Sequence, residues 1–293
     1  MIIVFDSDNV IKRMKYIALK YKNFDWQNLS YLFIKSILNT VKDMDGKKVY
    51  CLWDISRSAY RLNHYKEYKA NRDNKEETEE EKLMTETLVL AKNYLINNLK
   101  KIGITSIALP EIEADDISYY ITHLYKNEKG TLVTEDKDWY LNITTNWKVY
   151  HPVKKITVDQ KIFNELMEND PNPKERFLLY KALIGDTSDN IKGVDGVGEK
   201  NGLKYSEHLL YNKDLGTSKI AEKIKNSSDI IDLNKKLMDI SWIMTQEDIK
   251  EKIDHQRTLP NDNVERTDWD KFYSPLSKKW IESNSFWNIV RNL

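Results

Sequence analysis

The feature that most constrains the fold is a series of short apolar runs separated by longer amphipathic segments. The runs read as buried strands and lie at 2–5 ("IIVF"), 48–53 ("KVYCLW"), 106–109 ("SIAL") and 131–134 ("TLVT"). Segments with helical periodicity lie between them, at 29–38, 84–99 and 112–124. Short buried strands that alternate with helices predict an α/β fold with a central, mostly parallel sheet and helices on both faces.

The C-terminal part of the chain has a different pattern. Residues 148–159 predict one or two further strands, and the pattern becomes helical from about residue 163. The segment "NDPNPK" at 169–174 is rich in turn residues and marks the best candidate for a domain boundary. We therefore predict a catalytic α/β domain at 1–170 and a helical region at 171–293.

Composition indicates the compartment. No stretch approaches the roughly 20 apolar residues that a membrane span requires, and the opening "MIIVFD" reads as a core strand, not as a basic leader. Cys51 is the single cysteine, which fits a reducing compartment and a buried structural role. We expect a cytoplasmic monomer that does not associate with membranes.

Aspartates follow the predicted strands. Asp6 ends the first strand, Asp54 ends the second, and Asp136 follows the fourth, with Asp138 two residues on. Because ligands bind at the carboxyl ends of the strands in parallel sheets, we expect these side chains to meet at one edge. Any one of them could instead cap the helix that follows its strand.

Two further segments add carboxylates to this edge. "EIEADD" opens a helix, and "GDTSD" follows a helical run. Oxygen ligands alone favour Mg²⁺ or Mn²⁺ over structural zinc, and a cluster this large suits two or more ions in phosphoryl chemistry. The predicted metal ligands are Asp6, Asp54, Glu113, Asp115, Asp116, Asp136, Asp138, Asp186 and Asp189.

The net charge of zero conceals a segregation of charge. The chain has 46 acidic and 46 basic residues, and nine of the acids belong to the predicted cluster, so the remainder is basic. A basic body around an acidic pocket suits a polyanionic substrate held through metal ions. Residues 57–72 interleave Tyr60, Tyr65 and Tyr68 with five cations, which is typical of a single-strand channel. The alternative is a solvated amphipathic helix with buried tyrosines.

Taken in order, these motifs resemble the 5′-nuclease (flap endonuclease) superfamily. "LWD", "YKANRD", "EIEADD", "TEDKDW" and "IGDTSDNIKGVDGVGEK" carry the resemblance, which extends from residue 1 to roughly 205. It is strongest to the bacteriophage 5′–3′ exonucleases, a group to which T-even phage ribonuclease H is related. The resemblance implies a PIN-like core, a helical arch at about 57–98 and a helix-hairpin-helix-type element at about 176–210.

The resemblance also implies roles for single residues. It assigns Lys69 and Arg72 to the scissile phosphate and places Tyr68 to stack on a terminal base. Further contacts with nucleic acid fall on Arg13, Lys181, Gly193, Gly196, Gly198 and Lys200. In such proteins the glycine hairpin can also bind K⁺ through backbone carbonyls. This chain departs from the family pattern at Lys137, where glycine is usual, and in the acidic segment after "YKANRD".

The implied activity is that of a divalent-metal-dependent, structure-specific 5′-nuclease. Such an enzyme hydrolyses phosphodiester bonds in DNA or RNA–DNA, as a 5′–3′ exonuclease or flap endonuclease in phage DNA replication and primer removal. The implied partners are nucleic acid with a 5′-flap, a nick or an overhang, and a single-strand-binding or replication protein.

Two other classes remain open from the residues alone. "FDSDNV" and "GDTSD" also resemble motifs of haloacid-dehalogenase-type phosphatases, with Asp6 as nucleophile and Asp8 as general acid. Against this, the segment before "GDTSD" reads as helix, whereas that family requires a strand there. The third class is a non-catalytic nucleic-acid-binding protein of the same fold.

Overall fold

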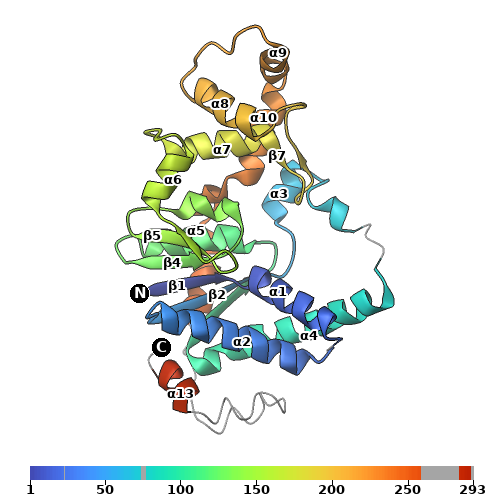
Figure 1. The fold of residues 1–293 in the computed structure, drawn as a ribbon, viewed down its shortest axis with the longest axis vertical. Helices are drawn as coiled ribbons and strands as arrows, with labels where there is room; N and C mark the ends of the chain where they lie inside the picture. Colours follow the sequence, from blue (N-terminus) through green and yellow to red (C-terminus); the bar gives the residue numbers. More distant parts are fainter. Residues whose placement is uncertain (23, 74–76, 259–283, 292–293) are drawn as a thin grey trace.

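A six-stranded sheet runs through the centre of the molecule, in the order β3-β2-β1-β4-β5-β6 (Figure 1). The computed structural model describes residues 1–22, 24–73, 77–258 and 284–291. The strands are β1 (Ile2–Asp6), β2 (Lys48–Asp54), β3 (Ile104–Leu109), β4 (Gly130–Val133), β5 (Trp147–His151) and β6 (Ile156–Val158). The first five are parallel and β6 is antiparallel to β5, which confirms the predicted fold class.

The strand order places a topological switch beside β1. The chain passes from β1 to β2 and β3 on one side, and then returns to β4 and β5 on the other. Crossovers that leave a parallel sheet in opposite directions open a crevice at the carboxyl ends of the two strands at the switch. Asp6 lies at this point, because it is the last residue of β1.

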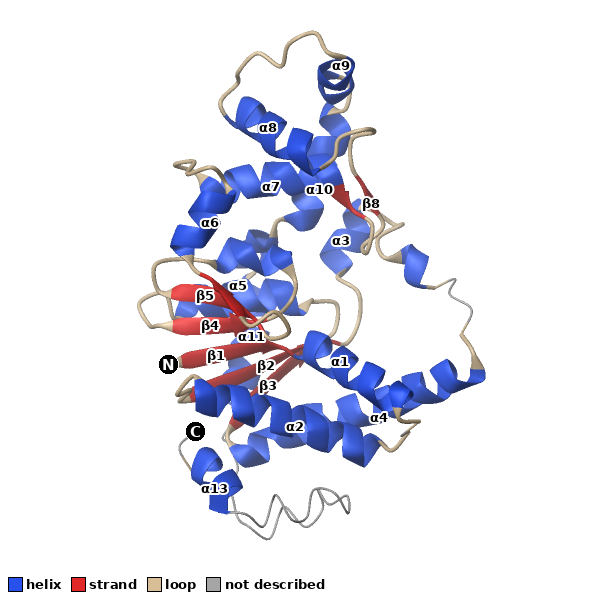
Figure 2. Ribbon diagram, viewed as in Figure 1, coloured by secondary structure: helices blue, strands red, loops and turns tan. Residues whose placement is uncertain are grey.

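Alternate residues of the strands face two separate cores, as the two-residue period of a strand requires. Ile3 and Phe5 belong to one core and Ile2 and Val4 to the other. The first core lies under α1 (Ser7–Lys20), α2 (Trp26–Asp43), α4 (Glu79–Asn98) and η2 (Leu99–Ile102). The second lies under α5 (Ala114–Leu124), η3 (Lys137–Asn142), η4 (Ile240–Thr245) and α11 (Glu247–Thr258) (Figure 2).

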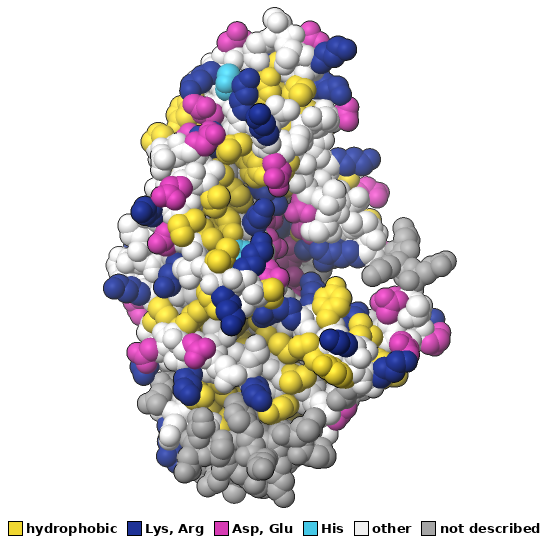
Figure 3. Space-filling view, viewed as in Figure 1, with side chains coloured by type: hydrophobic (Ala, Val, Ile, Leu, Met, Phe, Trp, Pro, Cys, Tyr) yellow, Lys and Arg dark blue, Asp and Glu magenta, His cyan; other side chains and the backbone are white. Residues whose placement is uncertain are grey.

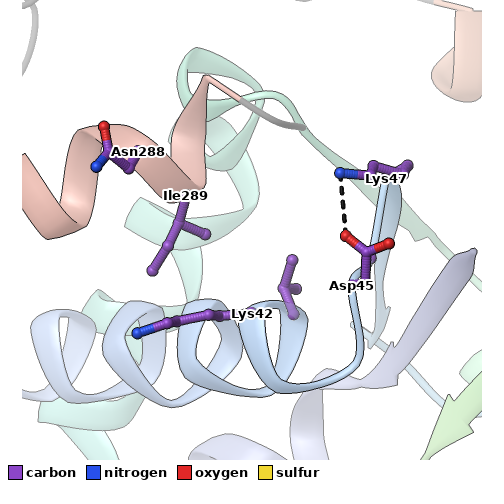
Figure 4. A pocket seen from close by; sticks show the side chains of 7 residues that line it. Lys42, Asp45, Lys47, Asn288 and Ile289 are labelled. Carbon is purple, nitrogen blue, oxygen red and sulfur yellow. Dashed lines mark ion pairs between the residues drawn. The ribbon is translucent and has the colours of Figure 1, made fainter.

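The last described helix, α13 (Asn284–Val290), packs against the first core. Phe286 is fully buried in that core. Ile289 points toward the last turns of α2, and the Asp45–Lys47 ion pair at 3.0 Å holds the turn into β2 (Figure 4). The predicted domain 171–293 also includes 259–283, which lie outside the described residues.

The predicted helical region packs around a third core. Its members are α7 (Pro173–Ile184), α8 (Glu199–Leu210), α9 (Lys219–Lys225) and α10 (Ser228–Met238), and α6 (Gln160–Leu166) precedes them. Between α7 and α8 the chain forms the short hairpin of β7 (Gly185–Asp186) and β8 (Ile191–Lys192), followed by the glycine-rich turn. Two packed helices joined by a hairpin are compatible with a helix-hairpin-helix element, which stays a prediction, as do the domain boundaries.

The segment predicted as an arch leaves the carboxyl edge of β2 and returns along the sheet as α4 (Figure 1). Its described elements are α3 (Ala59–His64), the turn η1 (Ala70–Arg72) and α4. A capping box between Thr78 and Glu81 begins α4. The acidic run after "YKANRD" thus supplies the first turn of a helix, where the helix dipole favours negative charge.

Among the described residues, no helix is long and apolar enough to cross a membrane.

The turn that ends α7 depends on a glycine. Gly185 has φ +75°, and a Cβ there would lie 2.2 Å from the backbone N of Gly193. Gly196 has φ +78°, but a Cβ there would meet only the Nζ of Lys223, at 3.6 Å. Both positions therefore have a left-handed φ, but an added Cβ would clash with neighbouring backbone only at Gly185.

We expect Gly185→Ala to lower the free energy of unfolding by about 3 kcal/mol or more, and Gly196→Ala by about 1 kcal/mol, since the second variant carries only the cost of the left-handed φ. Urea denaturation followed by circular dichroism measures both values. Equal losses in the two variants would contradict the role assigned to the Gly185–Gly193 contact.

Candidate active site

Three strand ends bring carboxylates to the carboxyl edge of the sheet, as predicted. Asp6 accepts hydrogen bonds from the backbone N–H of Asn9 at 3.0 Å and from Thr134 Oγ1 at 2.7 Å. Asp54 Oδ1 accepts from the N–H of Ala114 at 2.6 Å, and Asp136 Oδ1 from the N–H of Asp138 at 2.9 Å. Each side chain therefore caps a helix or turn and also lies at the carboxyl edge of the sheet, so the two predicted alternatives are compatible.

The carboxylates at this edge repel one another electrostatically. Burial and the charges of Asp136 and Asp54 raise the pKa of Asp115 well above its usual range. Burial and the charges of Asp8 and Glu113 raise the pKa of Asp54 to about 7. Asp115 is oriented by Trp139, whose indole N–H donates to its Oδ1 at 2.5 Å.

Glu113 is buried, at 2% exposed. Its carboxylate binds Lys69 Nζ at 2.9 Å and the hydroxyl of Tyr68 at 2.8 Å, and Arg61 lies 3.4 Å away. Burial alone would raise the pKa of Glu113, but the charges of Arg61 and Lys69 outweigh it and lower that pKa. Glu113 is therefore held in its charged form.

The "YKANRD" and "GDTSD" segments, far apart in sequence, lie side by side. The N–H of Lys69 donates to the carbonyl of Asp189 at 2.9 Å, and the guanidinium of Arg72 binds the Asp189 carboxylate at 2.7 Å. The amide of Asn71 donates to the carbonyl of Thr187 at 2.9 Å. Lys69 adopts a left-handed φ of 56°, which points its side chain inward to Glu113 while its backbone faces Asp189.

Lys181 forms ion pairs with two of the remaining acids. Its ammonium lies 2.8 Å from Asp138 and 3.0 Å from Asp186. Burial would lower the pKa of Lys181, but the charges of the two aspartates raise it. Asp138, Asp186 and Asp189 line one small recess together with Asp115, Arg61 and Tyr68.

Asp116 lies apart from the other predicted ligands, and its role as a metal ligand stays a prediction. It is fully buried and accepts a two-pronged hydrogen bond from Arg61, at 2.7 and 2.9 Å, and a third from the indole of Trp242 at 2.8 Å. Asp115 and Asp116 are successive residues of one helix, so their side chains point in different directions. Asp116 faces the core and Asp115 faces the cluster.

Tyr68 is placed differently from the predicted stacking position. Its ring is 1% exposed, and its hydroxyl donates to Glu113 and lies 3.0 Å from Asp189. A base cannot stack on a ring without an exposed face, so the predicted stacking does not fit this arrangement.

Two of the predicted nucleic-acid contacts lie elsewhere on the described structure. Arg13 lies 3.5 Å from Glu135, and Lys200 is exposed in the first turn of α8.

The sequence interpretation missed the structural roles of Arg61, Asp8 and Lys92. The sequence predicts Arg61 among the cations of a single-strand channel at 57–72, but it is 3% exposed and also donates to the carbonyl of Leu237 at 2.8 Å. The sequence suggests a role for Asp8 only as the general acid of a phosphatase, yet Asp8 forms a largely buried ion pair with Lys92 at 2.6 Å. No spacing in the sequence connects residues 8 and 92.

The donor set fits a hard divalent cation. Asp6, Asp54, Asp115 and Asp136 offer only oxygen, and several of them raise one another's pKa, a repulsion that a cation would relieve. Across the described ranges, no three carboxylate, imidazole or thiol groups stand in a ready-made metal arrangement. Lys69 and Lys181 lie between carboxylates instead.

The surface around the cluster has the predicted segregation of charge. Figure 3 shows acidic side chains at the bottom of a hollow in the middle of this face, with Lys and Arg side chains around it.

Comparison with known proteins agrees with this geometry. Residues 1–168 match the family described as "5′-3′ exonuclease, N-terminal resolvase-like domain". A 5′-3′ exonuclease of Buchnera aphidicola subsp. Acyrthosiphon pisum is 34% identical over 176 residues, which cover 59% of this chain and 57% of the relative. The flap endonuclease of Escherichia phage T5 is 28% identical over 223 residues, covering 71% of this chain and 74% of that protein.

The fold is also found among solved structures. The T5 5′-exonuclease with bound divalent metal ions (zinc) superimposes with a TM-score of 0.76 at 24% identity, over 89% of this chain and 99% of that one. The chain belongs to the family of the 5′–3′ exonuclease N-terminal resolvase-like domain, which confirms the predicted resemblance and argues against the phosphatase reading.

Arg61 gives a direct test of the network behind the site. Arg61→Met would leave Asp116 buried without its cation, and we expect a loss of about 3–5 kcal/mol in the free energy of unfolding. The matched control is Arg57→Met, because the Arg57–Asp73 pair is partly exposed and such a pair contributes about 0–1 kcal/mol. Thermal and urea denaturation measure both, and a loss below about 1 kcal/mol for Arg61→Met would contradict the buried-pair assignment.

Proposed function

We propose that this protein is a divalent-metal-dependent, structure-specific 5′-nuclease acting at 5′ ends and flap junctions of DNA or RNA–DNA. The observation that carries the proposal is the meeting of the "YKANRD" cations with the acidic cluster: Lys69 and Arg72 lie against Glu113 and Asp189 at the carboxyl edge of the sheet. Family membership supports it, and the matched segment of the Buchnera relative is 57% of that protein.

In this proposal the acids have one task and the cations another. Asp6, Asp54, Asp115 and Asp136, with Glu113, would hold Mg²⁺ or Mn²⁺, which when bound supplies a nucleophilic water and neutralises charge on the phosphate. Lys69 and Arg72 would exchange carboxylate partners for the scissile phosphate and stabilise its developing charge. Asp138, Asp186 and Asp189 would complete the cluster, with Lys181 as a further phosphate contact.

The glycine turn before α8 would contact duplex phosphates. Gly198 caps α8, and backbone N–H groups at a helix N-terminus favour anions. Lys200 is exposed nearby. A complex of the bacteriophage T5 flap endonuclease with DNA and metal ions, which has a TM-score of 0.71 with this chain, supports a nucleic-acid substrate. A K⁺ ion at this turn and a single-strand-binding partner are further parts of the proposal.

The first test maps products on a labelled 5′-flap, a nicked duplex and an RNA-primed duplex. We expect cleavage near the junction or the 5′ end with Mg²⁺, and none when EDTA removes the metal. Binding without cleavage on any substrate would instead favour the non-catalytic nucleic-acid-binding reading.

A second test concerns Lys69. We expect Lys69→Ala to lower the single-turnover rate by roughly 10²- to 10³-fold, since it removes charge stabilisation at the phosphate, and to weaken flap binding far less. Lys66→Ala is the control, because Lys66 is exposed three residues away. Equal losses of rate and affinity would indicate a plain electrostatic role.

A further inference from the structure

Asp8 and Lys92 bind the backbone of Asp54 on the side of the sheet that α1 and α4 cover. The N–H of Asp54 donates to Asp8 Oδ2 at 2.8 Å. The ammonium of Lys92 binds Asp8 Oδ1 at 2.6 Å and also donates to the carbonyl oxygen of Asp54. Asp8 lies in the first turn of α1 and Lys92 in α4, so three separate elements meet at one residue of β2.

These contacts restrain Asp54, whose carboxylate is a proposed metal ligand. Both backbone polar groups of Asp54 are bound by one ion pair, and its carboxylate is bound by the N–H of Ala114 at the start of α5. The Asp8 and Lys92 side chains are 11% and 15% exposed, so little water competes for these bonds. Groups that orient a ligand in this way commonly change metal affinity or activity by about 10- to 100-fold when they are removed.

Lys92 also connects the site to the arch segment. It lies on α4, the helix by which that segment returns to the sheet (Figure 1). Its described polar contacts are those with Asp8 and Asp54, and its ammonium lies 5.9 Å from the centre of the Trp53 ring. A shift of α4 would therefore be transmitted to the peptide group of Asp54.

We propose that Asp8 and Lys92 are positioning residues: together they aim the Asp54 carboxylate into the metal cluster and couple α4 to it. The proposal rests on the proposed function, because it assigns Asp54 a metal. The competing explanation is that the pair only joins α1 to α4 and contributes to stability.

The test compares Asp8→Asn, Lys92→Met and the double variant with the wild-type protein. Asp8→Asn keeps the side-chain shape and an acceptor oxygen, and the double variant removes both charges and so leaves no buried charge unpaired. Lys82→Met is the matched control, since Lys82 lies on the same helix in an exposed pair with Glu79. Circular dichroism establishes that each variant is folded.

Two quantities are measured: Mn²⁺ affinity by calorimetry without nucleic acid, and the kcat and KM of flap cleavage. We expect each single variant to weaken Mn²⁺ binding and lower kcat by about 10-fold or more, with KM nearly unchanged. The double variant should lose less than the product of the two single losses, because both act through one contact. The control should match the wild type.

A lower melting temperature with unchanged Mn²⁺ affinity and kcat would overturn the proposal and leave a structural pair. The proposed nuclease function and the positioning role of Asp8 and Lys92 can fail independently of each other. If the wild type cleaves no substrate but Asp8→Asn still weakens Mn²⁺ binding, the proposed function fails and the positioning role stands. If the wild type cleaves and the variants equal it in both measurements, only the positioning role fails.

Discussion

The crowding of carboxylates at the carboxyl edge of the sheet is the constraint on which the surrounding structure depends. Burial and the charges of Asp136 and Asp54 raise the pKa of Asp115, so the joint ionisation of these carboxylates costs free energy in the absence of a cation. The protein places cations against the neighbouring acids: Lys69 against Glu113, and Lys181 between Asp138 and Asp186. Sequence-distant segments are held at the site by these pairs.

Two ion pairs connect the helices after residue 170 to the carboxyl edge of the sheet. Asp189, from the hairpin after α7, binds Arg72, and Lys181 of α7 binds Asp138. Arg61 joins the segment after β2 to α5 through Asp116, and to the end of α10 through the carbonyl of Leu237. Tyr60 stacks on Trp242 with ring centroids 4.2 Å apart and extends that joint. These segments therefore meet through charge as well as apolar packing.

Much of the fold could be predicted because local pattern determines it. The run "IIVF" and the helical periodicity of 84–99 became β1 and most of α4, since burial of apolar side chains selects the same faces in both cases. The convergence of Asp6, Asp54 and Asp136 followed from a general property of parallel sheets. The sequence could not show that Asp116 pairs with Arg61, because its neighbour Asp115 has the same chemistry and only helix rotation separates the two side chains.

What the sequence by itself determined is the sheet, its helices, the oxygen-only donor set and the family. The first three follow from residue type and from spacing along the chain, and the family follows from the resemblance of its motifs. The tertiary structure decided which acids face the cluster, that the Tyr68 ring is buried, and that Lys92 meets Asp8 across 84 residues of sequence. Ion pairs between distant elements have no periodic signal, because their geometry exists only after the helices have packed against the sheet.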